Sequence, residues 1–191
     1  MPNVPFAAAL IAGGLSRRMG HDKAFIPWDD QPLWQHQLAK LRSLNPQKLL
    51  ISCRQNQLIA SPDALILHDP IEDLGPLPAI ARCIEVAAPL PLLVLAVDMP
   101  HISIDLLQSM LINPNGIIFK SDRGYEPLCA FYPSTVLSLL ANHTRLQTFA
   151  QQAIDLGLLH TQTLTDNQKP TFLNLNHPSD LPSCHPPSPS P

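Results

Sequence analysis

Short apolar runs alternate along the chain with longer stretches that have helical hydrophobic spacing. The apolar runs occupy residues 6–11, 48–52, 64–68, 91–97 and 116–120. They predict strands: the run at 6–11 is expected to be buried, and the run at 91–97, which is continuous and apolar, is typical of a strand buried on both faces of a sheet. Residues 31–44, 77–88 and 104–111 instead predict helices. The expected buried stripes of the first two helices are Trp34, Leu38, Leu41 and Leu44, and then Ile80, Ile84 and Ala87.

The alternation of strand and helix predicts an α/β fold, in which a mostly parallel sheet has helices on both faces. The second half of the chain is less regular. There we expect a strand at 127–133, helices at 134–141 and 148–156, and further strands at 160–164 and 172–176. Residues 1–181 are expected to form one domain. Residues 182–191 are rich in Pro and Ser, which favours a disordered tail.

Composition narrows the class of protein. The chain has 191 residues, of which 45% are hydrophobic and 14% charged, and its formal net charge is −3. These values suit a compact enzyme and give no basic surface for nucleic acid or anionic membranes. No apolar run approaches the roughly 20 residues that span a bilayer, and no targeting signal is evident, so we expect a cytoplasmic protein. The cysteines, interpreted as reduced thiols, are Cys53, Cys83, Cys129 and Cys184.

A glycine-rich, basic loop follows the first predicted strand, in the stretch LIAGGLSRRMGHDKAF at residues 10–25. Gly13 and Gly14 let the backbone approach a ligand closely, so that several N–H groups can converge on an anion. Arg18 and Lys23 add formal positive charge. The spacing matches neither the dinucleotide fingerprint nor the P-loop. A plain turn with a solvated basic edge is the alternative, but the combination favours a phosphate site.

Carboxylates follow two other predicted strands, at the edge where open α/β sheets bind ligands. Asp98 ends the run at 91–97, where a hard oxygen ligand suits Mg²⁺. The alternative is an Asp that caps the following turn. Asp69 follows the run at 64–68, just before a Gly-Pro pair that begins a helix. Four nearby residues are interpreted as loop carboxylates or as histidines that bind no metal: Glu72, Asp73, His68 and His101.

Two amides lie close to the C-terminus, in the stretch NLNHP. Asn174 and Asn176 are two positions apart, which puts both side chains on one side of an extended segment. Paired amides suit recognition of a heterocycle or a phosphate. Capping of the turn before Pro178 is the alternative, and the sequence leaves both open.

Five segments, in order over residues 6–181, resemble the molybdenum cofactor guanylyltransferases, which are MobA-like nucleotidyltransferases. LIAGGLSRRMGHDKAFI resembles their signature L-A-G-G-x-S-x-R-M-G-x-D-K. DLGPLPAI and AVDMPHI are similar to G-P-L-x-G-I and P-C-D-M-P-x-[IL]. EPLCAFY and LNLNHPSDL are similar to P-L-x-A-x-Y and N-x-N-T-P-x-[ED]-L. Ser52 departs from the pattern, because relatives often have Asn there.

The resemblance implies a Rossmann-like three-layer sandwich of the nucleotide-diphospho-sugar transferase type, with a mostly parallel mixed sheet. It implies transfer of GMP from GTP to molybdenum-loaded molybdopterin, with release of pyrophosphate and with Mg²⁺ held by Asp98. The implied catalytic residues are Arg18, Lys23 and Asp98. The implied nucleotide-binding residues are Ile11, Ala12, Gly13, Gly14, Lys23, Asp69 and Asp98. Asn174 and Asn176 would lie on the pterin side.

The resemblance also bears on partners and rival functions. An accessory GTP-binding protein and molybdoenzyme chaperones are candidate partners of a chain that we expect to be monomeric. A CTP-dependent molybdopterin cytidylyltransferase is the nearest rival, but its family more often has L-A-A-G where this chain has Gly13-Gly14 after Ala12. A nucleotide-binding scaffold on a degenerate fold is the other rival. Arg17 and His21 are expected to face solvent.

Overall fold

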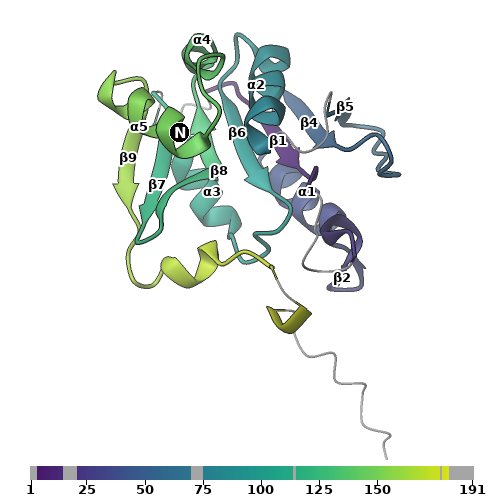
Figure 1. Ribbon diagram of the computed structural model, residues 1–191. Coiled ribbons are helices and arrows are strands. Elements are labelled where there is room, and N and C mark those ends of the chain that lie inside the picture. The colour runs from purple at the N-terminus through teal and green to yellow at the C-terminus, as the bar shows by residue number, and fades with distance from the viewer. Residues whose placement is uncertain (1–3, 15–20, 70–74, 114, 177, 181–191) are drawn as a thin grey trace, which may run out of the picture.

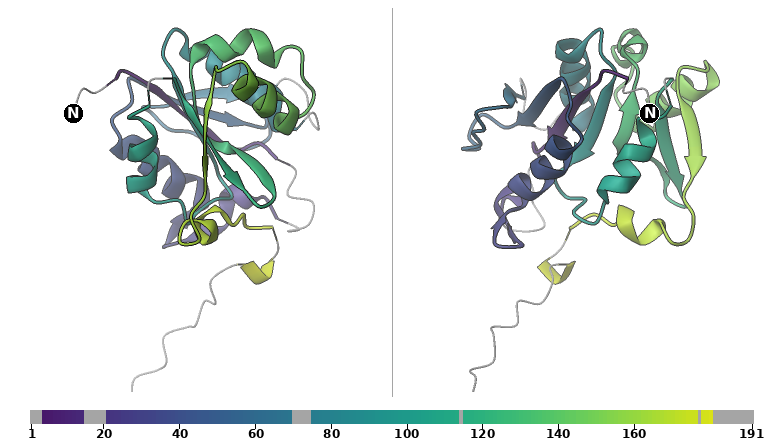
Figure 2. Two further views of the ribbon diagram at one scale, coloured as in Figure 1. Left: turned by 90° about the vertical axis from the view of Figure 1, so that its left-hand side faces the viewer. Right: turned by 180° about the vertical axis from the view of Figure 1, so that it is seen from behind.

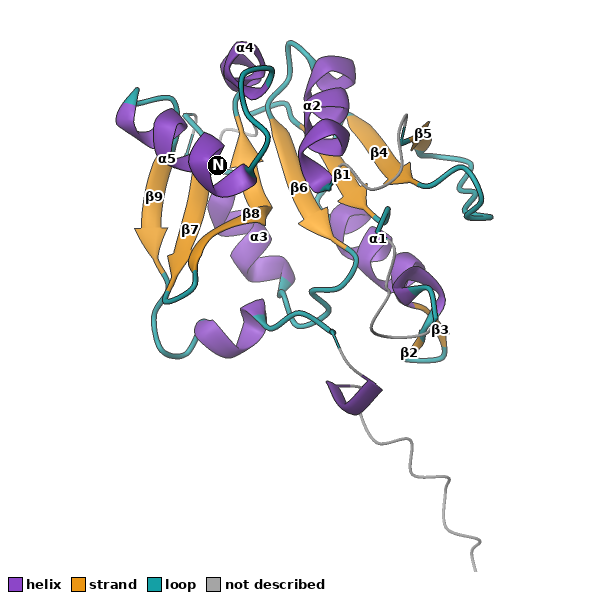
Figure 3. Ribbon diagram, in the orientation of Figure 1, coloured by secondary structure: helices purple, strands orange, loops and turns teal. Residues whose placement is uncertain are grey.

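A seven-stranded sheet forms the centre of the molecule, in the order β5-β4-β1-β6-β8-β7-β9 (Figures 1 and 3). The computed structural model describes residues 4–14, 21–69, 75–113, 115–176 and 178–180. The strands of the sheet are β1 (Ala7–Ile11), β4 (Lys48–Cys53), β5 (Leu65–His68), β6 (Leu92–Ala96), β7 (Ile117–Ser121), β8 (Gly124–Tyr132) and β9 (His160–Thr163).

The sheet is mostly parallel and mixed, as predicted. β1 pairs in parallel with β4 and β6, β4 with β5, and β7 with β9. β8 runs antiparallel to both β6 and β7. The two central strands β1 and β6 are buried along their whole length. This burial explains their continuous apolar sequences, because each strand has a packed layer on both of its faces.

Helices cover both faces of the sheet, which confirms the three-layer architecture (Figure 2). α1 (Leu33–Ser43) and α3 (Ile104–Met110) lie on one face. α2 (Pro76–Ala87), α4 (Leu137–Leu140) and α5 (Leu146–Asp155) lie on the other. The two predicted stripes are buried in different cores, that of α1 in the first and that of α2 in the second. Amphipathic spacing therefore predicted which helix faces meet the sheet.

The smaller elements complete the described chain. A two-stranded hairpin is formed by β2 (Pro27–Trp28) and β3 (Gln31–Pro32). The 3-10 helices are η1 (Lys23–Phe25), η2 (Ser134–Val136), η3 (Lys169–Phe172) and η4 (Pro178–Asp180). The helix predicted at 134–141 is η2 followed directly by α4. Across the described ranges, no helix has the length and apolar character that crossing a membrane requires. The tail expected at 182–191 lies outside the described residues.

The strand predicted at 172–176 is wrong. Phe172 ends the 3-10 helix η3, where its ring packs against Phe119 at 5.3 Å between ring centroids. Residues 173–176 have no regular secondary structure. The Leu175 N–H donates to the Asp98 carbonyl at 2.8 Å. The segment passes beneath the end of β6 instead of along a sheet edge (Figure 1), so no strand is beside it to pair with.

Candidate active site

The carboxyl ends of β5, β4, β1 and β6 lie at one edge of the sheet, because these neighbouring strands are parallel. The three loops that the sequence analysis singled out all leave from this edge. Backbone hydrogen bonds join the strand ends: the Ala12 and Gly13 N–H groups both donate to the Ser52 carbonyl, at 2.8 and 3.1 Å. The Val97 N–H donates to the Ile11 carbonyl at 3.0 Å. β1 therefore holds the ends of β4 and β6 in register with its own.

The N–H groups of Ala12 and Gly13 are hydrogen-bonded within the fold. Each donates to the carbonyl of Ser52. The reason is the parallel pairing of β1 with β4, which continues past the last residue of β1. Ile11 and Ala12 are also buried, with 4% and 2% of their surface exposed.

Asp69 lies against the backbone of Gly13. A Cβ atom added to Gly13 would lie 2.0 Å from Asp69 Oδ2, so no side chain fits there without displacing that carboxylate. The Ser52 hydroxyl donates to Asp69 Oδ1 at 2.6 Å. Glycine was expected here for close approach to a ligand, and the structure adds that a side chain at this position would displace the Asp69 carboxylate.

Burial raises the pKa of Asp69, against the opposing effects of the Ser52 hydrogen bond and of the positive charges of His68 and Arg54. A raised pKa means that the fold disfavours the charged carboxylate relative to the unfolded chain. The charged carboxylate of Asp69 therefore lowers the stability of the fold at neutral pH. Such groups are common at binding and catalytic sites.

Lys23, Asp98 and Asn176 meet at the end of β6, although they come from distant parts of the sequence. The Lys23 Nζ atom donates to Asp98 Oδ2 and to Asn176 Oδ1, at 3.0 Å in each case. The side chains of Lys23 and Asp98 are 14% and 18% exposed. The sequence analysis had placed these three residues at a phosphate, a metal and a pterin, and the structure brings them into direct contact.

One oxygen of Asp98 is kept apart from this contact. Asp98 Oδ1 is buried and has no hydrogen-bond partner among the described residues. A buried carboxylate oxygen without a donor costs free energy unless a cation or a ligand satisfies it. A hard anionic oxygen in this state is the donor that Mg²⁺ prefers. Asp98 Oδ1 is therefore a candidate ligand for a divalent cation, although the described residues group no three possible metal ligands together.

A buried polar network supports the segment that carries Lys23. Asp22 precedes Lys23 and accepts from Arg54 Nη2 at 2.6 Å and from Gln57 Nε2 at 2.8 Å. Gln57 is 4% exposed, and its Nε2 also donates to the Ala12 carbonyl at 3.1 Å. Its Oε1 accepts from the Arg54 N–H at 2.7 Å. These hydrogen bonds join Asp22, just before η1, to the segment after β4 and to Ala12 at the end of β1.

The comparisons with known proteins agree with this geometry. Residues 8–156 match the family described as "MobA-like NTP transferase domain". The chain belongs to the MobA-like NTP transferase family. A molybdenum cofactor guanylyltransferase from Xanthomonas euvesicatoria is 32% identical over 91% of this chain and 91% of its own length. Another from Pseudomonas fluorescens is 30% identical, over 95% and 94%.

The fold of this MobA-like chain is also found among solved structures. Molybdopterin-guanine dinucleotide biosynthesis protein A from Archaeoglobus fulgidus superimposes with a TM-score of 0.70. The match covers 92% of this chain and 94% of that one, at 21% sequence identity. The expected nucleotidyltransferase architecture is confirmed.

The other residues singled out from the sequence of this MobA-like chain have varied outcomes. His68 lies 3.8 Å from the Cys53 sulfur, and His101 packs edge-on against Trp28. In the described ranges, neither belongs to a cluster of three or more possible metal ligands. His21 is exposed, as predicted, and Asn174 is partly buried. Four residues lie outside the described ranges, namely Arg17, Arg18, Glu72 and Asp73.

The described cysteines are reduced thiols, as predicted. Cys53, Cys83 and Cys129 are free and buried. Burial raises the pKa of Cys53 to about 11 and that of Cys83 to about 12. Thiols with such pKa values carry little thiolate at neutral pH, so these side chains act as packing groups. Cys184 lies outside the described residues.

The sequence analysis missed the supporting roles of Ser52, Arg54 and Gln57. All three lie at or just after the end of β4, on the edge that carries the site. Their position after a buried strand was a usable signal. Their partners were not predictable, because Asp22 is 32 positions from Arg54 and 35 from Gln57 in the sequence.

Replacing Asp69 with Asn tests the cost of its charge. Because the pKa of Asp69 is raised, Asp69→Asn is expected to unfold at an equal or higher temperature than the parent at pH 7. The difference in unfolding temperature between variant and parent shrinks as the pH falls through the raised pKa of folded Asp69 towards the pKa of about 4 of the unfolded chain. Thermal unfolding at pH 7 and pH 4.5 measures this.

Asp63→Asn is the matched control for Asp69→Asn. Asp63 is a surface carboxylate whose pKa is lowered by its hydrogen bonds to Arg42 and Ser61. A lowered pKa means that the charged carboxylate stabilises the fold, so Asp63→Asn is expected to be less stable than the parent at pH 7. Its stability is expected to match that of the parent only in strong acid. If Asp69→Asn behaved like Asp63→Asn, the buried carboxylate would be stabilising and our account of it wrong.

Proposed function

We propose that this protein transfers GMP from GTP to the phosphate of molybdenum-loaded molybdopterin, giving the guanine dinucleotide cofactor and pyrophosphate. The named relatives supply the reaction class. The observation that carries the assignment to this site is the contact of Lys23 with Asp98, whose second oxygen is buried and unpaired among the described residues. A nucleotidyltransferase needs positive charge and a metal-binding carboxylate at one point, and the two meet here.

The proposed reaction needs positioning and charge stabilisation more than acid–base chemistry. A phosphate oxygen of the acceptor forms a bond to the α-phosphorus of GTP, and the bond to the bridging oxygen of the β-phosphate breaks. Its electron pair leaves with pyrophosphate. The attacking oxygen is already anionic, so no general base has to take up a proton. Lys23 stabilises the charge that develops on the phosphates, together with Arg18.

Asp98 is the residue proposed to hold Mg²⁺, through the oxygen that has no partner in the described part of the chain. When bound, Mg²⁺ supplies Lewis-acid neutralisation of phosphate charge. The contact of Lys23 with Asp98 Oδ2 leaves Oδ1 for the cation. One carboxylate therefore serves both an ammonium group and a metal ion.

The nucleotide is proposed to lie along the loop after β1. The N–H groups of Ala12 and Gly13 already donate to Ser52, so Ile11, Ala12, Gly13 and Gly14 contribute shape and proximity here. Asp69 contacts the nucleotide beside Gly13. Asn174 and Asn176 lie towards the pterin, and the Asn176 amide is within hydrogen-bond distance of Lys23. A single side chain thus connects the two substrate sides.

The discriminating experiment compares nucleotides. Purified protein is incubated with labelled GTP or CTP, Mg²⁺ and molybdenum-loaded molybdopterin, and the dinucleotide product is separated and counted. We expect product with GTP and only background with CTP. Turnover that depends on CTP would overturn the proposal in favour of a cytidylyltransferase, and binding of GTP without turnover would favour a nucleotide-binding scaffold.

A further inference from the structure

The loop that carries Asp98 has no regular secondary structure of its own. It comprises residues 97–103, between the end of β6 and the start of α3, and we call it the Asp98 loop. A carboxylate that binds a metal must be held in one place, because misplacement by about an ångström is costly to catalysis. The loop therefore needs groups from other elements to hold it.

Two side chains of α1 bind the backbone on both sides of Asp98. Gln37 Nε2 donates to the carbonyls of Ala96 and Met99, at 3.0 Å in each case. Lys40 Nζ donates to the carbonyl of Pro100 at 2.5 Å and to that of Ile102 at 3.0 Å. Gln37 and Lys40 are one helical turn apart, so both reach the loop from one face of α1.

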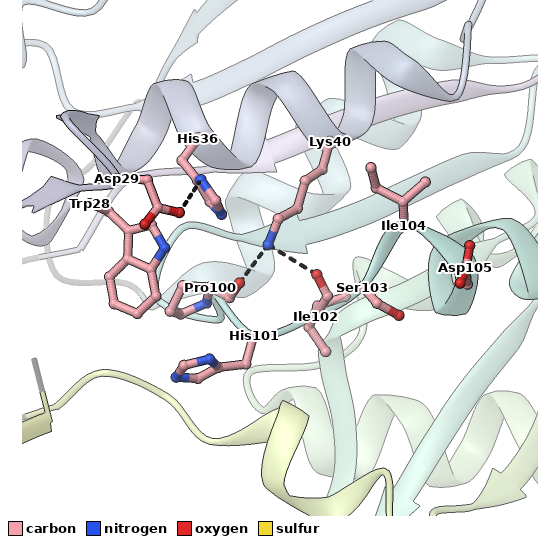
Figure 4. Close-up of a pocket in the computed structure, with 10 residues that line it drawn as sticks. All are labelled: Trp28, Asp29, His36, Lys40, Pro100, His101, Ile102, Ser103, Ile104 and Asp105. Carbon is pink, nitrogen blue, oxygen red and sulfur yellow. Dashed lines mark hydrogen bonds and ion pairs between the residues drawn. The ribbon is translucent and has the colours of Figure 1, made fainter. Parts of the chain in front are cut away.

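Lys40 is partly buried, so its bonds to the loop replace part of its solvation by water. Lys40 lies on the wall of a groove of about 610 Å³, and the opposite wall is the Asp98 loop at Pro100, His101 and Ile102 (Figure 4). Burial lowers the pKa of Lys40 to about 8, against the opposing effect of Asp29. An ammonium group is disfavoured in such surroundings unless acceptors compensate it, and the two carbonyls do so.

Gln37, the other α1 side chain that binds the loop, is a polar residue at a position normally filled by an apolar one. It is completely buried, in a helix whose neighbouring buried side chains are apolar. An apolar side chain would fill the same space without the need to satisfy an amide. Its two hydrogen bonds go to backbone carbonyls on either side of Asp98, that of Ala96 at the end of β6 and that of Met99 in the loop, so its contribution is directional. The Asp98 carbonyl itself accepts from Leu175, so the loop is fixed from a second side as well.

We propose that Gln37 and Lys40 are positioning residues, which hold the Asp98 loop so that the unpaired oxygen of Asp98 faces a divalent cation. The inference rests on the proposed function, because it takes Asp98 as the metal ligand. Neither side chain touches substrate. Each acts through the backbone of the loop that presents Asp98.

The test uses Mn²⁺ as the metal probe, because the electron paramagnetic resonance signal of free Mn²⁺ measures its binding directly. Lys40→Met and Gln37→Met keep side chains of similar length and remove the donors. In the presence of saturating GTP, each is expected to weaken Mn²⁺ binding about 10-fold, as outer residues around metal ligands typically do. Lys40→Arg keeps a charged donor and is expected to restore most of the affinity.

Lys48→Met is the matched control. Lys48 also donates to a backbone carbonyl, that of Val86 at 2.9 Å, but it lies at the amino end of β4, opposite the site. This variant is expected to bind Mn²⁺ as the parent does. Thermal unfolding of every variant separates a local effect from a loss of folded protein. Should Lys40→Met not fold, Lys40→Leu, which also lacks a donor, takes its place with the same expectation.

Two failures can be told apart. Asp98→Asn tests the metal role itself, and parental Mn²⁺ affinity in this variant would overturn the proposed role of Asp98. If Asp98→Asn loses affinity while the folded Gln37 and Lys40 variants keep it, only the positioning inference is overturned. A fall in unfolding temperature without a change in Mn²⁺ affinity also overturns that inference, because a merely structural role predicts that pattern.

Discussion

Lys23→Met is expected to lower kcat for guanylyl transfer by about 10²- to 10³-fold, as the loss of one preorganised charge-stabilising group does in other enzymes. Methionine keeps the length of the side chain and removes the ammonium group. Lys23 contacts Asp98 and Asn176 at 3.0 Å, so its charge lies beside the carboxylate that we propose for the metal and the amide that we propose for the pterin side. Initial rates with varied GTP measure the effect, and KM is expected to change less than kcat.

The control for Lys23→Met is again Lys48→Met, which removes a lysine of the opposite sheet edge. It is expected to retain parental kcat. A retained kcat in Lys23→Met would contradict the assignment of Lys23 to charge stabilisation. A loss in KM alone, with kcat unchanged, would instead make Lys23 a ground-state binding residue.

Gly13→Ala is expected to destabilise the fold by at most about 1 kcal/mol, the low end of the cost of adding a group to a packed position, because only the end of one side chain has to move. The new methyl group would lie 2.0 Å from Asp69 Oδ2, so the carboxylate has to move away. That movement breaks the hydrogen bond from Ser52, and binding of GTP is expected to weaken with it. Denaturant unfolding and a titration with GTP measure the two effects.

A double-mutant cycle isolates the contact between Gly13 and Asp69. Asp69→Ala removes the carboxylate, so Gly13→Ala made in that background is expected to cost less than it does in the parent. Contacting residues show coupling of about 0.5–3 kcal/mol in such cycles. Strictly additive losses would mean that the methyl group disturbs something other than Asp69.

The local hydrophobic pattern predicted most of the strands and helices, because the burial of their side chains repeats regularly along the chain. The runs at 6–11 and 91–97 are continuous and apolar because β1 and β6 are covered on both faces. The stripe of Trp34, Leu38 and Leu41 is helical because one face of α1 meets the sheet. The same reasoning failed at 172–176, where a strand was expected. Leu175 is buried there but Leu173 is exposed, and the Asn176 side chain accepts a hydrogen bond from Lys23, so no strand-like burial repeats.

In the candidate site too, the sequence predicts some features and only the structure shows the others. Gly13, Lys23, Asp69, Asp98 and Asn176 could be named from the sequence, because residue type and position after a strand limit the chemistry. Their contacts could not be named, since 75 positions separate Lys23 from Asp98 and 153 separate it from Asn176. Hydrogen bonds over such separations depend on how the strands are ordered, which no local pattern encodes.

The sequence by itself determined the α/β class, the buried strands and helix faces, and the residue types that gather at the sheet edge. Only the tertiary structure showed that the Asp69 carboxylate lies against Gly13 and that Ser52 donates a hydrogen bond to it. It alone placed Gln37 and Lys40 of α1 on the Asp98 loop. The physical reason is that periodicity follows burial, which is local and repeats along the chain. The hydrogen-bond partners of a polar side chain, by contrast, depend on which distant segments of the chain the fold brings next to it.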